Sequence, residues 1–335
     1  MVSAAAARGR GPWATAVRRL GRDRTAMLSL LLLALIVLSA VAAPLYAHDI
    51  AHTNPFGTNI EGSTIVHGKR VPVIQQGGGR LKLGEIPIGP TWDIHHYFLG
   101  ADSLGRDVMA RVLYGGQASL LIGVGSAVLC TIMALIVGLL SGFFGGVVDS
   151  VLTQFMDILW AFPVYLLAIA LATVTLTQGL RIGILNVNPA SLWVPTLIIA
   201  VIYVPYVARP IRGDVLSVRR KEFVEAAIAE GASDWWLIVR EVLPNVITTA
   251  IVLLPLMIST NILTESALSF LSIGVQPPQA SWGTIVSDGQ DLLYSRPWIS
   301  LAPGIMIMLT VLSLNFFGDG VRDALDPRAR LRVDR

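Results

Sequence analysis

The chain contains 335 residues, of which 54% are hydrophobic and only 14% are charged, against about 25% charged residues in an ordinary soluble domain. This composition, with a mean hydropathy of +0.66, indicates an all-α integral membrane protein. The formal net charge of +3 gives no reason to expect binding to nucleic acid. The single cysteine, Cys130, excludes an intramolecular disulfide and a thiolate metal cluster, and we expect it to be a packing residue.

The first 26 residues form a basic segment ahead of an apolar run from Met27 to Ala43. We expect a first transmembrane helix over residues 27–46, with residues 1–26 in the cytoplasm. The alternative is a cleaved signal peptide, since Ala40-Val41-Ala42-Ala43 resembles a cleavage region, but the apolar run is longer than such peptides usually have. The segment has one acid, Asp23, against six arginines: Arg8, Arg10, Arg18, Arg19, Arg22 and Arg24.

Residues 47–98 are polar and rich in proline and glycine, and an outward-running first span places them outside the cell. Three short apolar stretches predict a small hairpin in this loop: Ile65-Val66, Val71-Pro72-Val73 and Leu81-Lys82-Leu83. Imidazole suits several metal ions, but the histidine spacing matches no zinc pattern, so we expect no metal site. All five histidines lie here, namely His48, His52, His67, His95 and His96.

Residues 99–116 have the pattern of an amphipathic segment on the membrane surface. Five further spans follow, each near the roughly 20 residues needed to cross the hydrocarbon core. We predict these spans at residues 118–142, 152–176, 191–209, 246–272 and 298–318. Prolines are expected to bend several of them, namely Pro163, Pro195, Pro205 and Pro255.

The basic residues predict the orientation of these spans. Six spans put both termini on one side, and the loops at 177–190 and 273–297 hold only Arg181 and Arg296 as basic residues. This asymmetry places the N-terminus, the loop of residues 210–245 and the tail of residues 319–335 in the cytoplasm. In and around the 210–245 loop the basic residues are Arg209, Arg212, Arg219, Arg220, Lys221 and Arg240.

Two acidic residues, Asp157 and Glu265, lie within predicted spans. A charge at mid-membrane costs roughly 2.5–3.5 kcal/mol on insertion scales, so both side chains should face the bundle interior or a water-filled cavity. For each residue two roles stay open: hydrogen bonding to a neighbouring helix, or a place in a translocation pathway or gate.

No catalytic constellation is present in the sequence. Gly77-Gly78-Gly79-Arg80 lacks the lysine and the hydroxyl of a nucleotide-binding loop, so the chain is not expected to hydrolyse ATP. No histidine falls within a predicted span. We therefore expect no enzymatic activity and no cofactor bound by this chain.

A short helical segment, residues 221–234, lies between two of the apolar runs. It is rich in helix formers, but a helix this short is marginal in water and needs a surface to pack on. Its alanines offer small faces for close approach by a partner. Gly231 is expected to end the helix, and Ser233 or Asp234 to cap the next turn.

Within this segment Glu225-Ala226-Ala227, Gly231 and the later Leu243-Pro244 resemble the EAA loop of ABC-importer permeases, although Glu241 stands where that motif expects an apolar residue. Residues 99–108 are similar to a signature of dipeptide, oligopeptide and nickel permeases, with Ala101 in place of a threonine. Further stretches resemble the second permease subunit of such importers: Asp157 with Ala161-Phe162-Pro163, residues 211–216, 267–271, 274–278, 281–283, 318–320 and 322–328.

The resemblance implies a type I ABC-importer permease fold, with a transmembrane domain over residues 99–318. The loop at 47–98 is longer than expected for this family, and the resemblance does not explain it. It implies a cell-membrane protein that imports dipeptides or oligopeptides. The implied partners are a homologous permease, two cytoplasmic ATPase subunits that bind ATP and Mg, and an external binding protein, which the hairpin of the long loop would meet. The residues implied to couple to the ATPase are Glu222, Glu225, Ala226, Ala227, Gly231, Ala232 and Asp234.

Three alternatives remain at this point. A nickel importer of the same family differs only in its substrate. An ion-driven secondary transporter predicts internal repeats and intramembrane ionisable groups near broken helices, and only Asp157 and Glu265 meet the second condition. A membrane scaffold would use the segment at 221–234 simply as a docking site.

Overall fold

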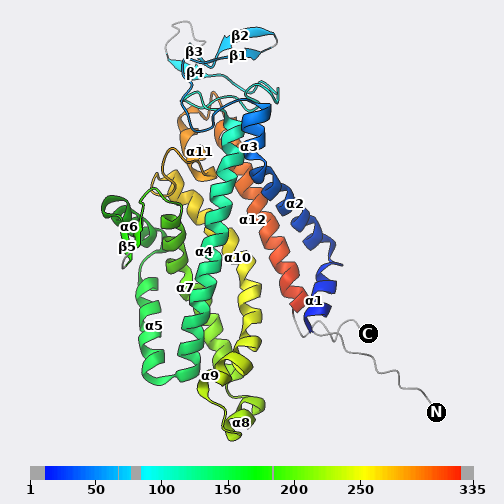
Figure 1. Cartoon of the computed structure of the whole chain (residues 1–335), viewed down its shortest axis with the longest axis vertical. Helices are drawn as coiled ribbons and strands as arrows, with labels where there is room; N and C mark the ends of the chain where they lie inside the picture. Colours follow the sequence, from blue (N-terminus) through cyan, green and yellow to red (C-terminus); the bar gives the residue numbers. More distant parts are fainter. Residues whose placement is uncertain (1–11, 67, 77–83, 183–184, 326–335) are drawn as a thin grey trace, which may run out of the picture.

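The computed structural model describes residues 12–66, 68–76, 84–182 and 185–325, and it shows an elongated helical bundle (Figure 1). Within this part of the chain five helices are long and apolar enough to cross a membrane, and a bent helix pair raises the number to six if it counts as one span. The long helices are α2 (Arg24–Val41), α4 (Val108–Phe144), α7 (Trp193–Val218), α10 (Leu243–Phe270) and α12 (Trp298–Leu325), and the bent pair is α5 (Gly146–Ala161) with α6 (Val164–Gln178).

Helices α4 and α7 pack against each other along the centre of the bundle. A Cβ built on Gly138 would lie 2.7 Å from Ile211 Cγ2, and one built on Gly142 would lie 2.7 Å from Val215 Cβ. Glycines at this spacing let two membrane helices approach closely, which is how such helices gain packing contacts in lipid. Cys130 is fully buried in the same core, as expected for a packing residue.

Only one of the predicted proline bends interrupts a span. The chain leaves helical geometry at Phe162 and Pro163, and the two helices on either side meet at 91°. Pro205 and Pro255 lie inside continuous helices. Pro195 lies in the first turn of α7, where a missing N–H removes no helical hydrogen bond.

The predicted surface segment at 99–116 is wrong in its second half. Helix α4 begins at Val108, because Asp107 caps it by accepting hydrogen bonds from the Met109 and Ala110 N–H groups. Arg111 on this first turn is only 2% exposed. Residues 108–116 therefore begin the second span and lie inside the protein.

The long loop after α2 folds into two small hairpins at one end of the bundle (Figure 1). Strand β1 (Ser63–Val66) pairs antiparallel with β2 (Lys69–Pro72), which confirms a hairpin between the first two predicted stretches. Strand β3 (Ile74–Gln76) pairs with β4 (Glu85–Pro87). The third predicted stretch, Leu81-Lys82-Leu83, lies outside the described residues, as do His67 and Gly77–Arg80.

The remaining elements are short and lie at the ends of the long helices or between them. Helix α8 (Glu222–Ala229) and α9 (Asp234–Leu237) form the end opposite the hairpins (Figure 1). They are accompanied by α1 (Pro12–Leu20), α3 (Ala43–Leu45), the π-helices η1 (Tyr46–Ile50) and η2 (Ile238–Val242), the strands β5 (Leu180–Ile182) and β6 (Leu185–Val187), α11 (Trp282–Asp288) and the 3-10 helix η3 (Gln290–Leu292).

Candidate coupling helix and charged sites of the bundle

Helix α8 is held to the bundle by a single buried side chain. Val224 is fully buried in the core formed with α4, α7 and α10. The other side chains of the helix are exposed or half-buried, including the large apolar Phe223 and Ile228. An eight-residue helix with so little packing leaves an acidic and apolar surface open to a partner.

The turn after α8 has a backbone that favours glycine. Gly231 has φ +87°, and its N–H donates to the Ile228 carbonyl at 3.0 Å. Ser233 then caps α9 by accepting from the Trp236 N–H, so the serine of the two predicted candidates is the capping residue. A shallow cavity of about 380 Å³ lies at this turn, lined by Ala227, Glu230, Gly231, Ala232, Ser233 and Trp236.

The structure brings the seven predicted coupling residues together at one end of the molecule (Figure 1). Next to them Trp235 and Trp236 are 67% and 43% exposed. Sequence reasoning did not assign these two tryptophans to the site, although exposed aromatic residues are typical of the centres of protein interfaces. The predicted residues Asp157 and Glu265 lie elsewhere, each at its own position along the bundle.

Asp157 lies on α5 and is not buried. Its Oδ1 accepts a hydrogen bond from Arg209 Nη2 at 2.6 Å, and the two side chains are 59% and 35% exposed. The Arg209 guanidinium also lies over the Trp160 ring, 4.1 Å from its centre. The sequence groups Arg209 with the basic residues around the 210–245 loop, but the structure places it within α7. It is separated from Asp157 by 52 residues in the sequence.

A second ion pair joins α5 and α7 nearer the end of the bundle that carries α8. Arg212 donates to both carboxylate oxygens of Asp149, each at 2.6 Å, in a bidentate pair. Asp149 also accepts from Thr153 at 3.1 Å. The pair ties α5 to α7 and satisfies both carboxylate oxygens.

Glu265 is fully buried on α10 and is held by two serines. Its two carboxylate oxygens accept hydrogen bonds from Ser119 Oγ on α4, at 2.8 Å, and from Ser269 Oγ, at 2.7 Å. Ser119 Oγ in turn accepts from the N–H of Trp282 at the start of α11, and Ser269 Oγ from the N–H of Val275. One carboxylate thus organises α4, α10, α11 and the segment that joins the last two.

A buried cluster of charges joins the long loop to the bundle at the hairpin end. Asp102 Oδ2 accepts from Arg106 Nε at 2.7 Å, and Arg111 Nη2 donates to Asp288 Oδ2 at 2.7 Å. Arg106 Nη2 also donates to Asp288, at 2.9 Å, and Arg111 Nη1 to the Pro55 carbonyl. The cluster links the loop, α4 and α11. Sequence reasoning missed it, although all its members except Asp288 lie in the motif at 99–116.

Solved structures show which fold this arrangement belongs to. A chain of the MetNI methionine ABC transporter, solved in inward-facing conformations, aligns with a TM-score of 0.51 at 17% sequence identity, over 64% of this chain and 97% of that one. The protein therefore has the fold of a type I ABC-importer permease. This confirms the fold class implied by the EAA-like loop.

Sequence comparisons give the family. Residues 134–331 match the model of the binding-protein-dependent transport system inner membrane component, and residues 11–60 match that of the N-terminal TM domain of oligopeptide transport permease C. The chain belongs to this family of transport permeases. It is therefore a multi-pass membrane component of an ABC transporter, a system whose ATPase lies on partner subunits, and the alternative of an ion-driven transporter is wrong.

Several relatives match nearly the whole chain, and two of them illustrate the range. A putative peptide transport system permease protein of Brucella abortus is 37% identical over 323 residues, covering 96% of this chain and 94% of that protein. The oligopeptide transport system permease protein OppC of Escherichia coli K12 is 34% identical over 322 residues, covering 96% and 93%.

Proposed function

We propose that this chain is one of two homologous permease subunits of an ATP-driven importer for dipeptides and oligopeptides. Three relatives at 34–37% identity carry names of peptide, dipeptide or oligopeptide transport systems and match almost end to end. Nickel import within the same family has no comparable support, and the described residues contain no group of three or more histidine, cysteine or acidic side chains placed to hold a metal ion. An external binding protein would deliver the peptide.

The observation that carries the coupling role is the geometry of α8. The helix projects from the end of the bundle, is anchored through Val224, and continues through Gly231 and α9 into α10. We propose that it lies in a groove of a cytoplasmic ATPase subunit, which binds ATP and Mg. Moving a gate from 1:99 to 99:1 requires the ATPase to favour one state by about 5.5 kcal/mol, and a helix continuous with a span can transmit such a bias.

The orientation that we propose is supported by the position of α8 and the distribution of basic residues. Arg219, Arg220 and Lys221 precede α8, and the positive-inside rule favours the cytoplasm for such a cluster. Helix α1 and the end of α12 lie in the same half of the molecule as α8 (Figure 1). We propose that both termini are cytoplasmic and that the hairpins at residues 63–87 face the external binding protein.

We propose that Glu265 acts at the external gate. It holds α11 and the segment ahead of it against α4 and α10, so a change in its hydrogen bonds alters how that segment closes the bundle. Asp157 is the second proposed pathway residue. Unlike the buried Glu265, it lies on the surface of the chain, on α5.

The test is purification from the native membrane in mild detergent, followed by an ATPase assay with peptide-loaded binding protein. We expect a second permease and ATPase subunits to co-purify and the binding protein to stimulate hydrolysis. Glu225→Lys should leave assembly intact but reduce the stimulation, because it reverses a charge on α8. Asp323→Lys, a charge reversal at the exposed end of α12, is the matched control. Isolation of the chain without an ATPase would refute the proposal.

A further inference from the structure

The exposed pair Asp157–Arg209 lies about 15 Å inside the end of the bundle that carries α8. Asp157 is about three turns beyond the start of α5 at Gly146, a rise of about 16 Å. Arg209 precedes the end of α7 at Val218 by about 14 Å. Both ends lie at the same level, since Arg219 packs over Phe143 at the end of α4. Both estimates place the pair near the middle of a hydrocarbon core about 30 Å thick.

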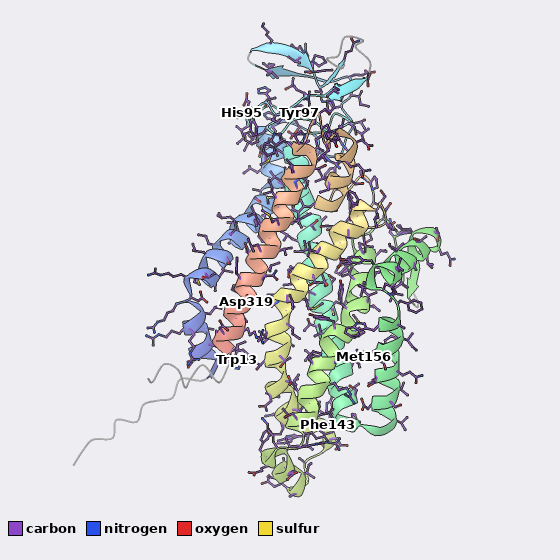
Figure 2. All side chains as sticks on the ribbon, turned by 180° about the vertical axis from the view of Figure 1, so that it is seen from behind. Trp13, His95, Tyr97, Phe143, Met156 and Asp319 are labelled. Carbon is purple, nitrogen blue, oxygen red and sulfur yellow. The ribbon has the colours of Figure 1, made fainter. Side chains whose placement is uncertain are left out.

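The surface of α5 and α7 that carries the Asp157–Arg209 pair is unsuited to contact with lipid. Charged side chains at mid-membrane are placed towards a bundle interior or a water-filled cavity, because exposure to lipid costs several kcal/mol. Met156, the preceding residue, is fully buried in the bundle core (labelled in Figure 2). Asp157 is about 100° further round the helix and points away from that core.

The backbone next to the pair leads to the same conclusion independently. The break at Phe162 and Pro163 comes little more than one turn after Asp157, and Phe162 is 55% exposed. Non-helical backbone at membrane depth is tolerated only where protein covers it or where it lines a water-filled cavity. The face therefore belongs to the inside of the assembled transporter.

The side chains on this face suit a peptide. Asp157 and Arg209 share a single hydrogen bond, and each has polar atoms for which no second partner is recorded among the described residues. Three exposed aromatic residues lie on the same stretches of chain: Trp160, whose ring lies under the Arg209 guanidinium, Tyr206, one turn before Arg209 on α7, and Tyr165, just beyond the break. The Asp149–Arg212 pair differs, because both oxygens of Asp149 bind the guanidinium and its role is to join α5 and α7.

We propose that this face lines the aqueous passage, and that the Asp157–Arg209 pair opens to receive the charged ends of a peptide in transit. Arg209 binds the terminal carboxylate, for which a guanidinium is well shaped. Asp157 binds the terminal ammonium, and the aromatic rings contact the side chains. The inference rests on the proposed function, in that a peptide is the cargo.

The first test measures access to water and does not depend on the cargo. Asp157→Cys is introduced into a Cys130→Ala background, and the assembled complex is treated with a charged, membrane-impermeant methanethiosulfonate reagent. We expect Asp157→Cys to react at a rate comparable to Tyr294→Cys, at a fully exposed position, whereas Leu31→Cys on α2 stays unmodified. An unreactive Asp157→Cys would show that protein or lipid covers the site, and would overturn the inference.

The second test measures transport in proteoliposomes at saturating, peptide-loaded binding protein. Asp157→Asn and Arg209→Gln should each lower maximal uptake of a tripeptide with free termini about tenfold, the effect of one charge-assisted hydrogen bond, while stimulated ATP hydrolysis is kept. Asp149→Asn, the matched control, should transport normally per assembled complex. Normal uptake by both test variants would overturn the inference. Failure of the wild-type complex to import peptide would instead count against the proposed function, and the labelling result would stand.

Discussion

At the residue scale, Asp107 makes the fold of the long loop after α2 sensitive to pH. The side chain is 1% exposed, and its burial raises the pKa of the carboxyl from 3.8 to about 6, despite hydrogen bonds from two backbone N–H groups and Thr53. The folded protein thus binds the Asp107 proton more tightly than the unfolded chain does, so protonation of Asp107 stabilises the fold. This contribution to stability is fully present below about pH 4 and is lost as the pH rises through about 6.

We predict that Asp107→Asn removes this dependence. The lost stability at neutral pH amounts to at most about 3 kcal/mol, from about 1.4 kcal/mol per pKa unit. Hydrogen-exchange protection factors of residues 53–66 and 100–115 in the intact complex, each corrected for the intrinsic exchange rate at its pH, should be larger at pH 5 than at pH 7.5 in the wild type. The asparagine can still cap α4, so its protection factors should differ little between the two pH values. An equal pH effect in both proteins would assign the titration to another group.

Glu265 permits a second prediction at this scale. Glu265→Gln keeps an oxygen that can accept one serine hydroxyl, so expression and assembly should stay near normal while transport slows. Glu265→Ala leaves the hydroxyls of Ser119 and Ser269 without their acceptor, at a cost of about 1–3 kcal/mol for each buried group, and should lower the thermal stability of the complex. Full transport by the glutamine variant would remove the gate role and leave only packing.

Asp157 and Glu265 could both be identified from the sequence, because a carboxylate within an apolar run is conspicuous. Their hydrogen-bond partners could not be identified in this way. Arg209, Ser119 and Trp282 are distant in the chain from the acids that they serve, and no local pattern indicates which helices meet. The sequence also does not indicate how far each acid is buried. In the structure Glu265 is fully buried, whereas the Asp157 side chain is more than half exposed.

At the scale of elements, the turn after α8 depends on one backbone angle. Gly231 has φ +87°, and a Cβ built there meets no atom within 4 Å, so the backbone conformation alone restricts the residue. Gly231→Pro, with φ fixed near −65°, should uncouple ATP hydrolysis from transport while the complex still assembles. Gly231→Asn is the matched control, because asparagine tolerates this region, and it should retain most of the coupling. Normal import by the proline variant would refute the coupling role.

The contact between α4 and α7 gives another prediction. A Cβ on Gly142 would lie 2.7 Å from Val215 Cβ, so Gly142→Ala forces the helices apart and should destabilise the complex by about 1–3 kcal/mol, as overpacked cores do. Gly125→Ala on the same helix meets only Thr196 Cγ2, at 3.4 Å, and should be tolerated. Thermal unfolding of the two purified variants gives the comparison. Equal stabilities would show that the helices separate at little cost.

The spans themselves were predictable, since long apolar runs leave few alternatives in a membrane. The residues at which the spans begin and end were harder to predict. Helix α4 begins ten residues before the predicted span, because Asp107 caps it and the one charge that follows, Arg111, is neutralised by Asp102 and Asp288. Pro163 turned out to separate two helices, where a bend within one was expected.

At the scale of the whole molecule, the long loop after α2 is joined to the bundle by charge. Arg111 is 2% exposed and binds Asp288 and the Pro55 carbonyl. Arg111→Met removes a buried cation from this cluster, and breaking such a pair costs about 3–5 kcal/mol. We predict faster proteolysis within residues 47–107 in that variant. Arg70→Met, on exposed β2, should be cut like the wild type. Equal protection of both variants would mean that the hairpins are held by other contacts.

The length of α4 has a mechanical consequence. The helix runs for 37 residues without a proline, which is about 55 Å at 1.5 Å per residue. One rigid rod therefore extends from the charge cluster at the hairpin end to the turn at Gly145, near the end of the bundle that carries α8. A tilt of about 5° at one end displaces the other by about 5 Å, roughly one helical turn. Leverage of this kind lets an event at the hairpin end of the protein reach the α8 end without any unfolding in between.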